Sequence, residues 1–450
     1  MIRNRGRTDV RAITCSILLS AVLAQICMPV FASAFAEPTA IPALKSNLSP
    51  LAQENRSLLQ ARLVAAFDKE YARHRSRNRQ RNLADAFAVY YLRRELQALI
   101  DMWRATGKIV YLKQAEDLVL AAIAAAEANP QPLLWHNQSR GKWPCFFLKK
   151  VEKQKGGHNQ ICDFQGAAGF LMVADALRQA GQDRWKQIAD FVEKNIVEKW
   201  LFYIPTIRPS QLRGPESTKY LLILLDSARD KREYFAVICM DLDEFGYRKY
   251  DYGRWAKFLT DLYVGERANL ARRPPGFSTL DRQAPDDWGV VPRKSTGGYV
   301  WHYIPSSASR KVAVLDTSHA NRTVWLATKA YERRLVGRKT LDGFINTFRY
   351  QIWAPAKGPF HFNNYVDGSD AKQGRLGPGQ GGNIWFGWHR LAAYDDGLRD
   401  LFVSVAYDLT NGGPNIPRGA QNKAMENAPL CFYAWAARLL SPDGQPQRFP

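Results

Sequence analysis

Cysteine is scarce in this chain of 450 residues, which contains six, two of them in an N-terminal leader. Cys145 and Cys162 flank a loop rich in lysine and glycine, but they are not spaced as a zinc knuckle. In an exported protein they are the pair that a disulfide would join. A chain of this length buries enough surface to fold without such a crosslink. We expect no catalytic thiol.

Motifs for nucleotides and for catalytic serines are also missing. The sequence has no Walker-type phosphate loop, no Gly-x-Ser-x-Gly elbow, and no dinucleotide fingerprint between a strand and a helix. The glycine-rich segment Gly377–Gly382 follows an aromatic loop, and we interpret it as a turn near a cleft. Asp316 and His319 have the spacing of helical metal ligands, but no matching second pair accompanies them. The sequence therefore predicts an activity without cofactor or metal.

Apolar runs long enough to cross a membrane are absent after the first 36 residues. The leader carries four arginines, then the mainly small or apolar segment Ile13–Leu23, then Ala34-Phe35-Ala36, which is typical of a cleavage site. We interpret residues 1–36 as a signal peptide and predict a periplasmic or secreted protein with no integral membrane segment after cleavage. The alternative is an uncleaved anchor, which the short apolar core disfavours because a span needs about 20 residues.

Acidic residues are outnumbered by basic ones, 42 against 63, which gives a formal net charge of +21. A basic surface raises the local concentration of polyanions. For an exported protein we expect an acidic polysaccharide as the partner rather than nucleic acid. Two alternatives remain, an anionic membrane surface and a charge that serves solubility alone. The oligomeric state stays open.

Helical hairpins recur along the chain, with apolar residues at helical spacing and glycine in most of the turns between them. We expect hairpin turns at residues 105–107, 180–182, 337 and 396–397. Further helices are predicted at residues 83–104, 218–226, 234–247, 255–264 and 424–440. Such hairpins bury their apolar faces only by stacking or by closing into a ring. The sequence predicts an all-α fold, with an N-terminal extension and first helix at residues 37–80 and one catalytic domain at residues 81–450.

Two segments resemble a known superfamily. Trp-Arg-Ala-Thr-Gly-Lys-Ile-Val-Tyr-Leu-Lys-Gln-Ala (residues 103–115) and Gly-Trp-His-Arg-Leu-Ala-Ala-Tyr-Asp (residues 387–395) are similar to hairpins of the (α/α) toroid carbohydrate enzymes. The resemblance covers roughly residues 80–440. It implies an (α/α)6 or (α/α)7 toroid. The superfamily includes polysaccharide lyases, among them alginate and glucuronan lyases, and several families of glycoside hydrolases, so the fold alone does not select a reaction.

Histidines gather in the long stretches between predicted helices, where function is often found. Five of the seven lie there beside Asn, Tyr or Arg: His136, His158, His302, His319 and His361. Elimination from a uronate needs donors that neutralise the sugar carboxylate, a base for the adjacent proton and an acid for the leaving oxygen. Asn, His, Arg and Tyr suit these tasks, so we predict a secreted lyase that cleaves an acidic polysaccharide by β-elimination without a metal.

The segment that starts at Asp316 carries the central residues of this hypothesis. His319 and His302 are the candidates for the base or the partner of the sugar carboxylate. Tyr303 and Tyr365 are the candidate acid–base tyrosines, and Arg322 is the candidate carboxylate ligand. Replacing Arg322 by Ala should then lower turnover far more than stability. Asp316 has a second interpretation as a helix cap. Asn321 is the second candidate ligand of the sugar carboxylate, and the remaining substrate-binding candidates are His136, Asn137, His158, Asn159, Tyr299, His361 and Asn364.

Tryptophans are the second indication of a carbohydrate ligand, because flat aromatic rings stack on sugar rings. Trp301, Trp385 and Trp388 are the candidate platforms, whereas Trp325 and Trp435 have the pattern of core residues. Lys142 belongs to a basic loop, which is either a subsite for an extended polyanion or a solvated surface.

Three alternatives remain open. A glycoside hydrolase on the same scaffold would need a pair of acids, and those available are Asp163, Asp241, Asp243, Glu244, Asp316 and Asp367. An epimerase would use nearly the same residues as a lyase, since both remove the same proton. A non-catalytic polysaccharide-binding protein would keep the tryptophans and the basic residues without a convergent catalytic group.

Overall fold

Ten segments of the chain are described by a computed structural model. They are residues 56–77, 81–148, 153–213, 216–225, 229–265, 289–303, 313–358, 360–370, 384–411 and 428–441. All of them lie in the larger of the two units into which the chain divides, Ala43–Pro450. The predicted signal peptide lies outside the described residues, and so does the segment 377–382.

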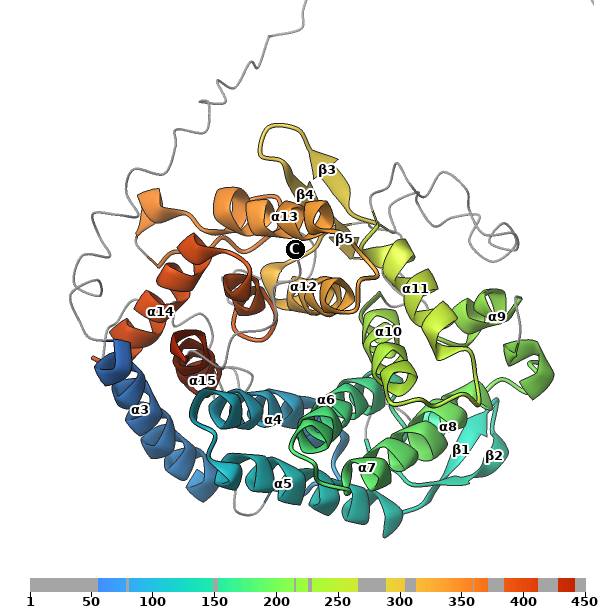
Figure 1. The fold of residues 1–450 in the computed structure, drawn as a ribbon. Helices are drawn as coiled ribbons and strands as arrows, with labels where there is room; N and C mark the ends of the chain where they lie inside the picture. Colours follow the sequence, from blue (N-terminus) through green and yellow to red (C-terminus); the bar gives the residue numbers. More distant parts are fainter. Residues whose placement is uncertain are drawn as a thin grey trace, which may run out of the picture. The chain divides into compact units, whose positions relative to one another are not determined.

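An inner ring of helices forms the centre of this unit (Figure 1). In chain order each inner element contacts the next, and the last contacts the first, so the ring is closed. Its members are α4 (Ala86–Thr106), α6 (Gln160–Gln179), α10 (Arg229–Glu244), α12 (Thr317–Glu332), the 3₁₀ helix η8 (Trp388–Ala393) and α15 (Ala428–Leu440).

An outer layer surrounds this ring, because each inner element alternates in the chain with an outer one (Figure 1). The outer members are α3 (Arg56–Arg77), α5 (Ile109–Glu127), α7 (Trp185–Val192) with α8 (Glu198–Leu201), α11 (Tyr252–Tyr263), α13 (Arg338–Thr347) and α14 (Asp396–Thr410). The structure confirms the predicted all-α toroid, with six inner elements among the described residues. The first helix α3 packs against α14 and α15 and so completes the outer layer.

The connections are of two kinds. Those that lead from an inner to an outer element are short. Three of them include the predicted turns at Gly107, residues 180–182 and Gly337, whereas the predicted turn at residues 396–397 lies in the first turn of α14. The helix α4 ends at Gly107, whose φ of 68° is left-handed and favours glycine. Most of those that lead from an outer to an inner element are long, and each enters its inner element at the end of the ring where the inner helices begin. Long connections at one end of a rigid scaffold commonly carry function.

Short strands interrupt the long connections. They form three antiparallel pairs: β1 (Gln131–Trp135) with β2 (Gln138–Trp143), β3 (Val291–Arg293) with β4 (Gly298–Val300), and β5 (His302–Tyr303) with β6 (Ala313–Val314). The sequence does not predict these hairpins, because each is too short for a clear alternation of apolar and polar residues.

Two inner elements differ from their predicted form. The helix α10 begins at Arg229, whereas the apolar pattern predicts its start at Tyr234. Its first turn is polar but buried, since Nε of Arg229 donates to Glu233 at 2.7 Å. The segment at residues 388–393 is a 3₁₀ helix rather than an α-helix. Before it, Gly387 approaches Asn321 so closely that a Cβ atom would lie 2.0 Å from the Asn321 carbonyl oxygen.

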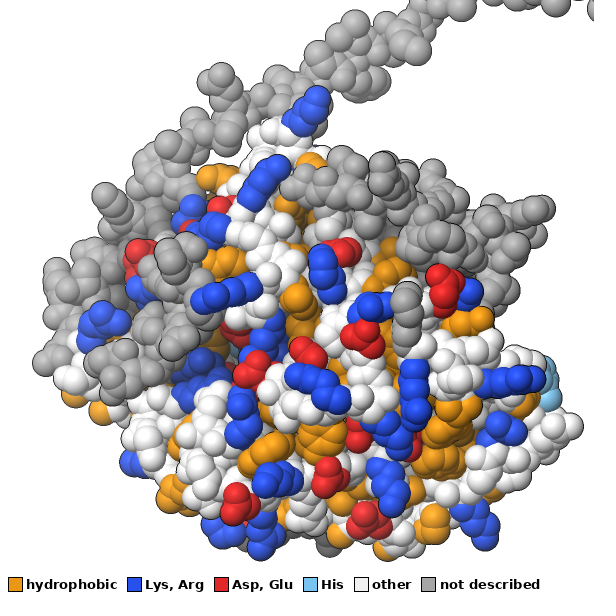
Figure 2. Space-filling view, turned by 45° about the vertical axis from the view of Figure 1, so that its right-hand side comes forward, with side chains coloured by type: hydrophobic (Ala, Val, Ile, Leu, Met, Phe, Trp, Pro, Cys, Tyr) orange, Lys and Arg blue, Asp and Glu red, His pale blue; other side chains and the backbone are white. Residues whose placement is uncertain are grey.

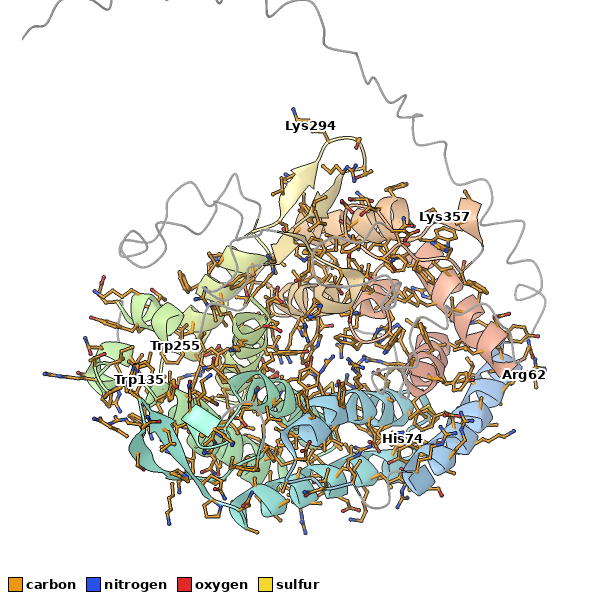
Figure 3. The ribbon with its side chains drawn as sticks, turned by 180° about the vertical axis from the view of Figure 1, so that it is seen from behind. Arg62, His74, Trp135, Trp255, Lys294 and Lys357 are labelled. Carbon is orange, nitrogen blue, oxygen red and sulfur yellow. The ribbon has the colours of Figure 1, made fainter. Side chains whose placement is uncertain are left out.

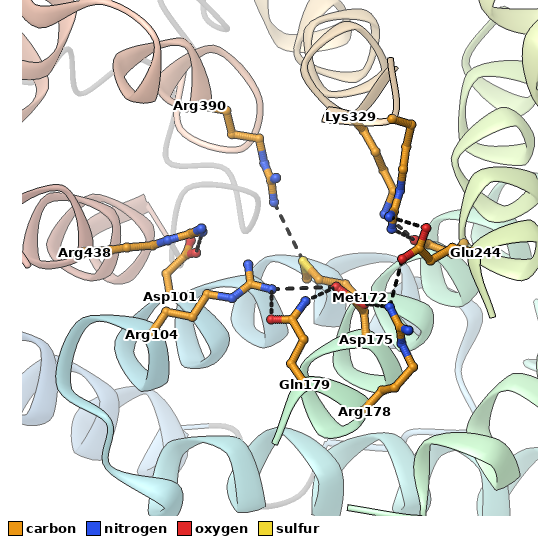
Figure 4. A network of polar contacts seen from close by, with 12 residues as sticks. Asp101, Arg104, Met172, Asp175, Arg178, Gln179, Glu244, Lys329, Arg390 and Arg438 are labelled. Atoms are coloured by element: carbon orange, nitrogen blue, oxygen red, sulfur yellow. Dashed lines mark hydrogen bonds and ion pairs between the residues drawn. The ribbon is translucent and has the colours of Figure 1, made fainter. Parts of the chain in front are cut away.

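Charged side chains cross-link the opposite end of the ring, where the inner helices end (Figure 4). Arg438 of α15 contacts Asp101 of α4 at 2.7 Å. Lys329 of α12 contacts Asp241 of α10 at 2.5 Å, and Arg178 of α6 contacts Glu244 of α10 at 3.0 Å. These pairs tie neighbouring inner helices together, so this end has a structural role.

Candidate active site

Asp316 and His319 form an acid–imidazole pair at the start of α12. The Asp316 side chain caps the helix, because Oδ1 accepts the backbone amide of His319 at 3.1 Å. Its Oδ2 lies 2.7 Å from Nδ1 of His319. Burial opposes the charge of Asp316, but His319 and Arg322 together outweigh it, and the pKa of this carboxyl is lowered. Asp316 is therefore an ionised carboxylate at neutral pH.

Arg322 lies one turn further along α12 and is buried. Its Nε donates to the hydroxyl of Tyr234 at 3.3 Å, and its Nη2 donates to the hydroxyl of Tyr90. Its Nη1 lies 3.5 Å from Oδ2 of Asp230. Burial lowers the pKa of Arg322, but the two tyrosines and Asp230 outweigh burial and raise it well above its usual value. Arg322 thus joins α4, α10 and α12 through a permanent positive charge.

Asp230 is the second carboxylate of the cluster. It lies in the first turn of α10, and its side chain is 17% exposed. Oδ1 of Asp230 accepts the backbone amide of Lys231 at 3.0 Å. The ring places Asp230 of α10 against Arg322 of α12, and the charge of Arg322 also helps to lower the pKa of Asp316, which caps the same helix α12. The sequence did not indicate Asp230, since the predicted helix starts four residues after it.

Aromatic rings lie next to this cluster on the first turns of α4. The ring centroids of Phe87 and Tyr90 are 6.4 Å apart, and those of Tyr90 and Tyr91 are 5.0 Å apart, both edge to face. Phe87 is 46% exposed. Burial raises the pKa of Tyr90 to about 12, although Arg322 opposes the shift, so its phenol stays protonated at neutral pH. An exposed ring beside a charged cluster suits the face of a sugar.

The segment at residues 360–370 folds over the start of α12. The backbone amide of Thr317 donates to the carbonyl of Asn364 at 2.8 Å, and Tyr365 forms a bridge with Asp316. Tyr365 is buried there. His361 is partly exposed and lies 3.1 Å from Asp370. Asn364 and Tyr365 therefore lie beside the start of α12 through backbone contacts with Thr317 and Asp316.

Several predicted ligands are instead buried in the protein. Nδ2 of Asn321 donates to the carbonyls of Thr317 and Ser318, and its Oδ1 accepts the backbone amide of Trp388. Trp301 packs against Trp388, with 5.8 Å between the ring centroids. The other buried rings among the predicted ligands are Tyr299 and Trp385. These aromatic side chains pack into the core and do not present a face to a sugar.

The remaining candidates lie apart from the cluster. His136 and Asn137 form the tight turn between β1 and β2, with φ values of 46° and 65°, and Lys142 is exposed on β2. This hairpin lies at the periphery, where Figure 3 shows Trp135 at the outer edge of the ring. The strand β5 holds His302 and Tyr303, for which the backbone alone is described.

His158 and Asn159 have roles in folding. Asn159 caps α6, since its side chain accepts the amide of Cys162 at 3.1 Å. His158 is fully buried, with Nε2 at 3.1 Å from the carbonyl of Gln131 and Nδ1 at 3.3 Å from Nζ of Lys199. Burial and Lys199 lower the pKa of His158 to about 3. Lys199 in turn pairs with buried Asp163 at 2.8 Å.

Features outside the cluster give no second catalytic centre among the described residues. A cavity of about 350 Å³ is lined by α3, α4 and α5, but its one buried acid, Glu95, is held by His74 and Arg81. No group of three or more His, Cys, Asp or Glu side chains in the described segments is arranged to hold a metal ion. The cysteines described, including Cys145 and Cys162, are free and buried. None of the described helices combines the length and the apolar character of a membrane span.

Basic side chains are dispersed on the face of the molecule that Figure 2 shows, with acidic and apolar side chains between them. Several basic residues are paired, as in Lys113 with Asp117 at 3.2 Å and Lys257 with Asp261 at 2.9 Å. The positive net charge is therefore not concentrated in one patch on this face.

Comparison with known proteins gives one structural match. No family model matches the chain, and no curated protein matches it. Among solved structures, the chain is similar to an inactive variant of the α-1,6-mannanase GH76A of Salegentibacter sp. HEL1_6 in complex with α-1,6-mannotriose. The identity is 11%, the TM-score is 0.47, and the alignment covers 86% of this chain and 100% of that chain. The likeness lies in the fold.

The prediction of a lyase is corrected by these findings. The similar structure is that of a mannanase, a glycoside hydrolase, and not of a lyase that acts on uronates. Within this structure, the two residues predicted to bind a sugar carboxylate are already engaged, because Asn321 bonds the backbone and Arg322 contacts Tyr90, Tyr234 and Asp230. The predicted elimination and the uronate polymers, alginate and glucuronan, are therefore withdrawn, and the chain is an (α/α) toroid with a pair of carboxylates at its loop end.

Proposed function

We propose that this chain is an exported glycoside hydrolase in which Asp230 and Asp316 are the catalytic carboxyl pair. The observation that supports this proposal is the position of Arg322, which lies 3.5 Å from Asp230 of the adjacent inner helix and one helical turn after the capping residue Asp316, whose pKa it helps to lower. Hydrolysis of a glycosidic bond commonly needs two carboxyl groups, one as acid and one as base or nucleophile.

The environments of the two carboxyls suggest their roles. Asp316 is held ionised by His319 and Arg322, so we assign it the role of base or nucleophile. Asp230, the more exposed member, is then the second carboxyl group that hydrolysis needs. Tyr90 remains protonated, so its hydroxyl can donate a hydrogen bond to a sugar oxygen while it accepts one from Arg322. His319, which is 26% exposed, holds Asp316 in place.

The substrate that we propose is a polysaccharide. Phe87 and Tyr91 lie beside the carboxyl cluster and supply the aromatic faces on which sugar rings stack. The leader at residues 1–36 supports export, since a polymer is met outside the cytoplasm.

The test is the release of new reducing ends from a panel of polymers by the purified mature protein. The panel holds an α-1,6-mannan, other α- and β-linked neutral glycans, and a carboxylated glycan. Ultraviolet absorbance is followed in parallel, because elimination alone creates a conjugated double bond. We expect reducing ends without absorbance. We expect Asp230→Asn and Asp316→Asn each to lower kcat by about 1000-fold or more on the polymer that is cleaved.

Asp243→Asn is the matched control, because Asp243 lies on the same helix as Asp230 but at the opposite end of the ring, where it is 46% exposed. It should retain full activity. Cleavage that survives in both carboxyl variants would contradict the assignment. Binding of a polymer with no cleavage by the unaltered protein would favour a non-catalytic binding protein instead.

A further inference from the structure

Two guanidinium groups share one indole inside the ring. Cζ of Arg93 lies 4.3 Å from the ring centroid of Trp325, and Cζ of Arg390 lies 5.6 Å from the same centroid. The three residues come from α4, η8 and α12, so the cluster exists only because the ring closes. Arg93 is fully buried.

Neither arginine has a carboxylate partner in the described part of the chain. Nη2 of Arg93 donates to the carbonyl of Phe386 at 3.3 Å, while its Nε and Nη1 have no hydrogen-bond acceptor among the described residues. Nη2 of Arg390 donates to the sulfur of Met172 at 3.7 Å, as Figure 4 shows, and its Nε likewise has no acceptor there. A carbonyl and a thioether are weak partners for two full charges.

The carboxylates near the two arginines contact other side chains. Asp101 and Glu332 partly offset the lowering of the pKa of Arg390 by burial, but Asp101 pairs with Arg438 at 2.7 Å and Glu332 accepts the hydroxyl of Tyr394 at 2.6 Å. Burial, followed by repulsion from Arg390 and Arg94, lowers the pKa of Arg93 to about 10, which still leaves it protonated at neutral pH. Contacts with aromatic faces compensate a buried cation only in part. The guanidinium groups of Arg93 and Arg390 therefore leave positive charge inside the ring, and a bound anion would neutralise it.

We propose that the interior of the ring holds a binding site for a phosphate-type oxyanion between Arg93 and Arg390, beside Trp325. The planar fork of an arginine presents paired N–H groups that match the oxygens of a tetrahedral anion. The inference rests on this cluster and not on the proposed hydrolase activity. Arg93 follows Tyr90 by one helical turn on α4, away from the end of the ring where the inner helices begin. A free phosphate and the phosphate of a sugar share the required chemistry.

The first experiment measures the thermal unfolding temperature of the purified protein against inorganic phosphate, at an ionic strength kept constant with sodium chloride. Since a ligand of the folded state stabilises it by mass action, we expect this temperature to rise with phosphate concentration. Arg390→Met should weaken the apparent Kd by about tenfold or more. Arg248→Met is the matched control, because Arg248 is 66% exposed and paired with Asp243, and its response should equal that of the unaltered protein.

A second variant and a comparison of ligands complete the test. If Arg390→Met does not fold, Arg390→Lys retains the charge but loses the fork, and its weaker phosphate binding is measured by calorimetry. Calorimetry of the unaltered protein with glucose 6-phosphate, inorganic phosphate and glucose separates the sources: tighter binding of the sugar phosphate identifies a phosphorylated sugar, and binding of inorganic phosphate alone identifies a free anion.

Absence of both stabilisation and binding heat in the unaltered protein would overturn the inference, and so would equal responses in the unaltered protein and the Arg390 variant that folds. Asp316→Asn separates this result from the proposed function. It should abolish hydrolysis and leave phosphate binding unchanged.

Discussion

The carboxylate of Asp316 contacts the same residue twice. One oxygen accepts the backbone amide of His319 at 3.1 Å, and the other lies 2.7 Å from the ring nitrogen of that residue. A helix cap and a contact with the imidazole ring are thus made by one side chain. The first contact fixes the orientation of Asp316, and the second helps to keep it ionised.

Replacing His319 by Ala should change the pH dependence of hydrolysis. His319 lowers the pKa of Asp316, so its removal raises that pKa. The ionised form of Asp316 is then lost at a higher pH as the solution is acidified, and the acidic limb of the kcat/KM profile should move to higher pH. We expect a loss of about 10- to 100-fold at the optimum. An acidic limb that stays in place would show that His319 does not act on the catalytic carboxyl.

Replacing Phe87 by Ala should weaken substrate binding with little effect on stability. Phe87 is 46% exposed, so the folded state loses little packing when the ring is removed. We expect KM to rise about tenfold, which corresponds to ~1.4 kcal/mol, and kcat to stay near its original value. Tyr350→Ala is the matched control, because Tyr350 is an aromatic residue with 42% exposure on the outer layer. Equal KM values for the Phe87→Ala and Tyr350→Ala variants would show that Phe87 does not bind the sugar.

Replacing Arg322 by Met should reduce stability, whereas the sequence predicts that the loss of Arg322 lowers turnover far more than stability. The change leaves Asp230 without its cation and removes the donor to Tyr90 and Tyr234. Loss of one member of a buried ion pair costs about 3–5 kcal/mol. Urea unfolding of the variant and of the unaltered protein measures this loss in the free energy of unfolding. The double variant Asp230→Asn with Arg322→Met should recover part of the loss, whereas a purely additive result would argue against coupling between the two residues.

Stability should fall on acidification partly through His158. Burial and Lys199 lower its pKa to about 3 in the folded state, while the unfolded chain has a value of about 6.5. Between these values the unfolded state takes up a proton that the folded state does not. The contribution of neutral His158 to the free energy of unfolding is fully present above pH ~6.5 and is lost as the pH falls. In that range the free energy of unfolding decreases by up to about 1.4 kcal/mol per pH unit. His158→Gln should flatten this dependence in urea unfolding experiments at pH 4–7, and an unchanged slope would exclude His158 as its source.

Local features of the fold were predictable from the sequence. Gly107 ends α4 because a left-handed residue is needed there, and Asp316 begins α12 because a carboxylate accepts a free amide of the first turn. Both signals act within a few residues. The first turn of α10, which contains Asp230, was not predicted because its residues are polar. Arg229 and Glu233 can be buried there because they pair with each other in the folded protein.

Contacts between distant residues decided the candidate site. Trp301 and Trp388 are tryptophans of the kind that stack on sugar rings, but in this structure they pack against each other. They do so because the ring buries the start of η8 against α12. Tyr90, Asp230 and Arg322 are separated by many residues in the chain, and no periodic pattern relates them.

The sequence by itself determined the alternation of helices and turns, because apolar spacing, caps and glycines act over one or two helical turns. The tertiary structure alone decided which charged side chains face one another inside the ring. That choice depends on how six inner elements rotate and close, and each charge gains a partner or remains without one only when the ring is complete.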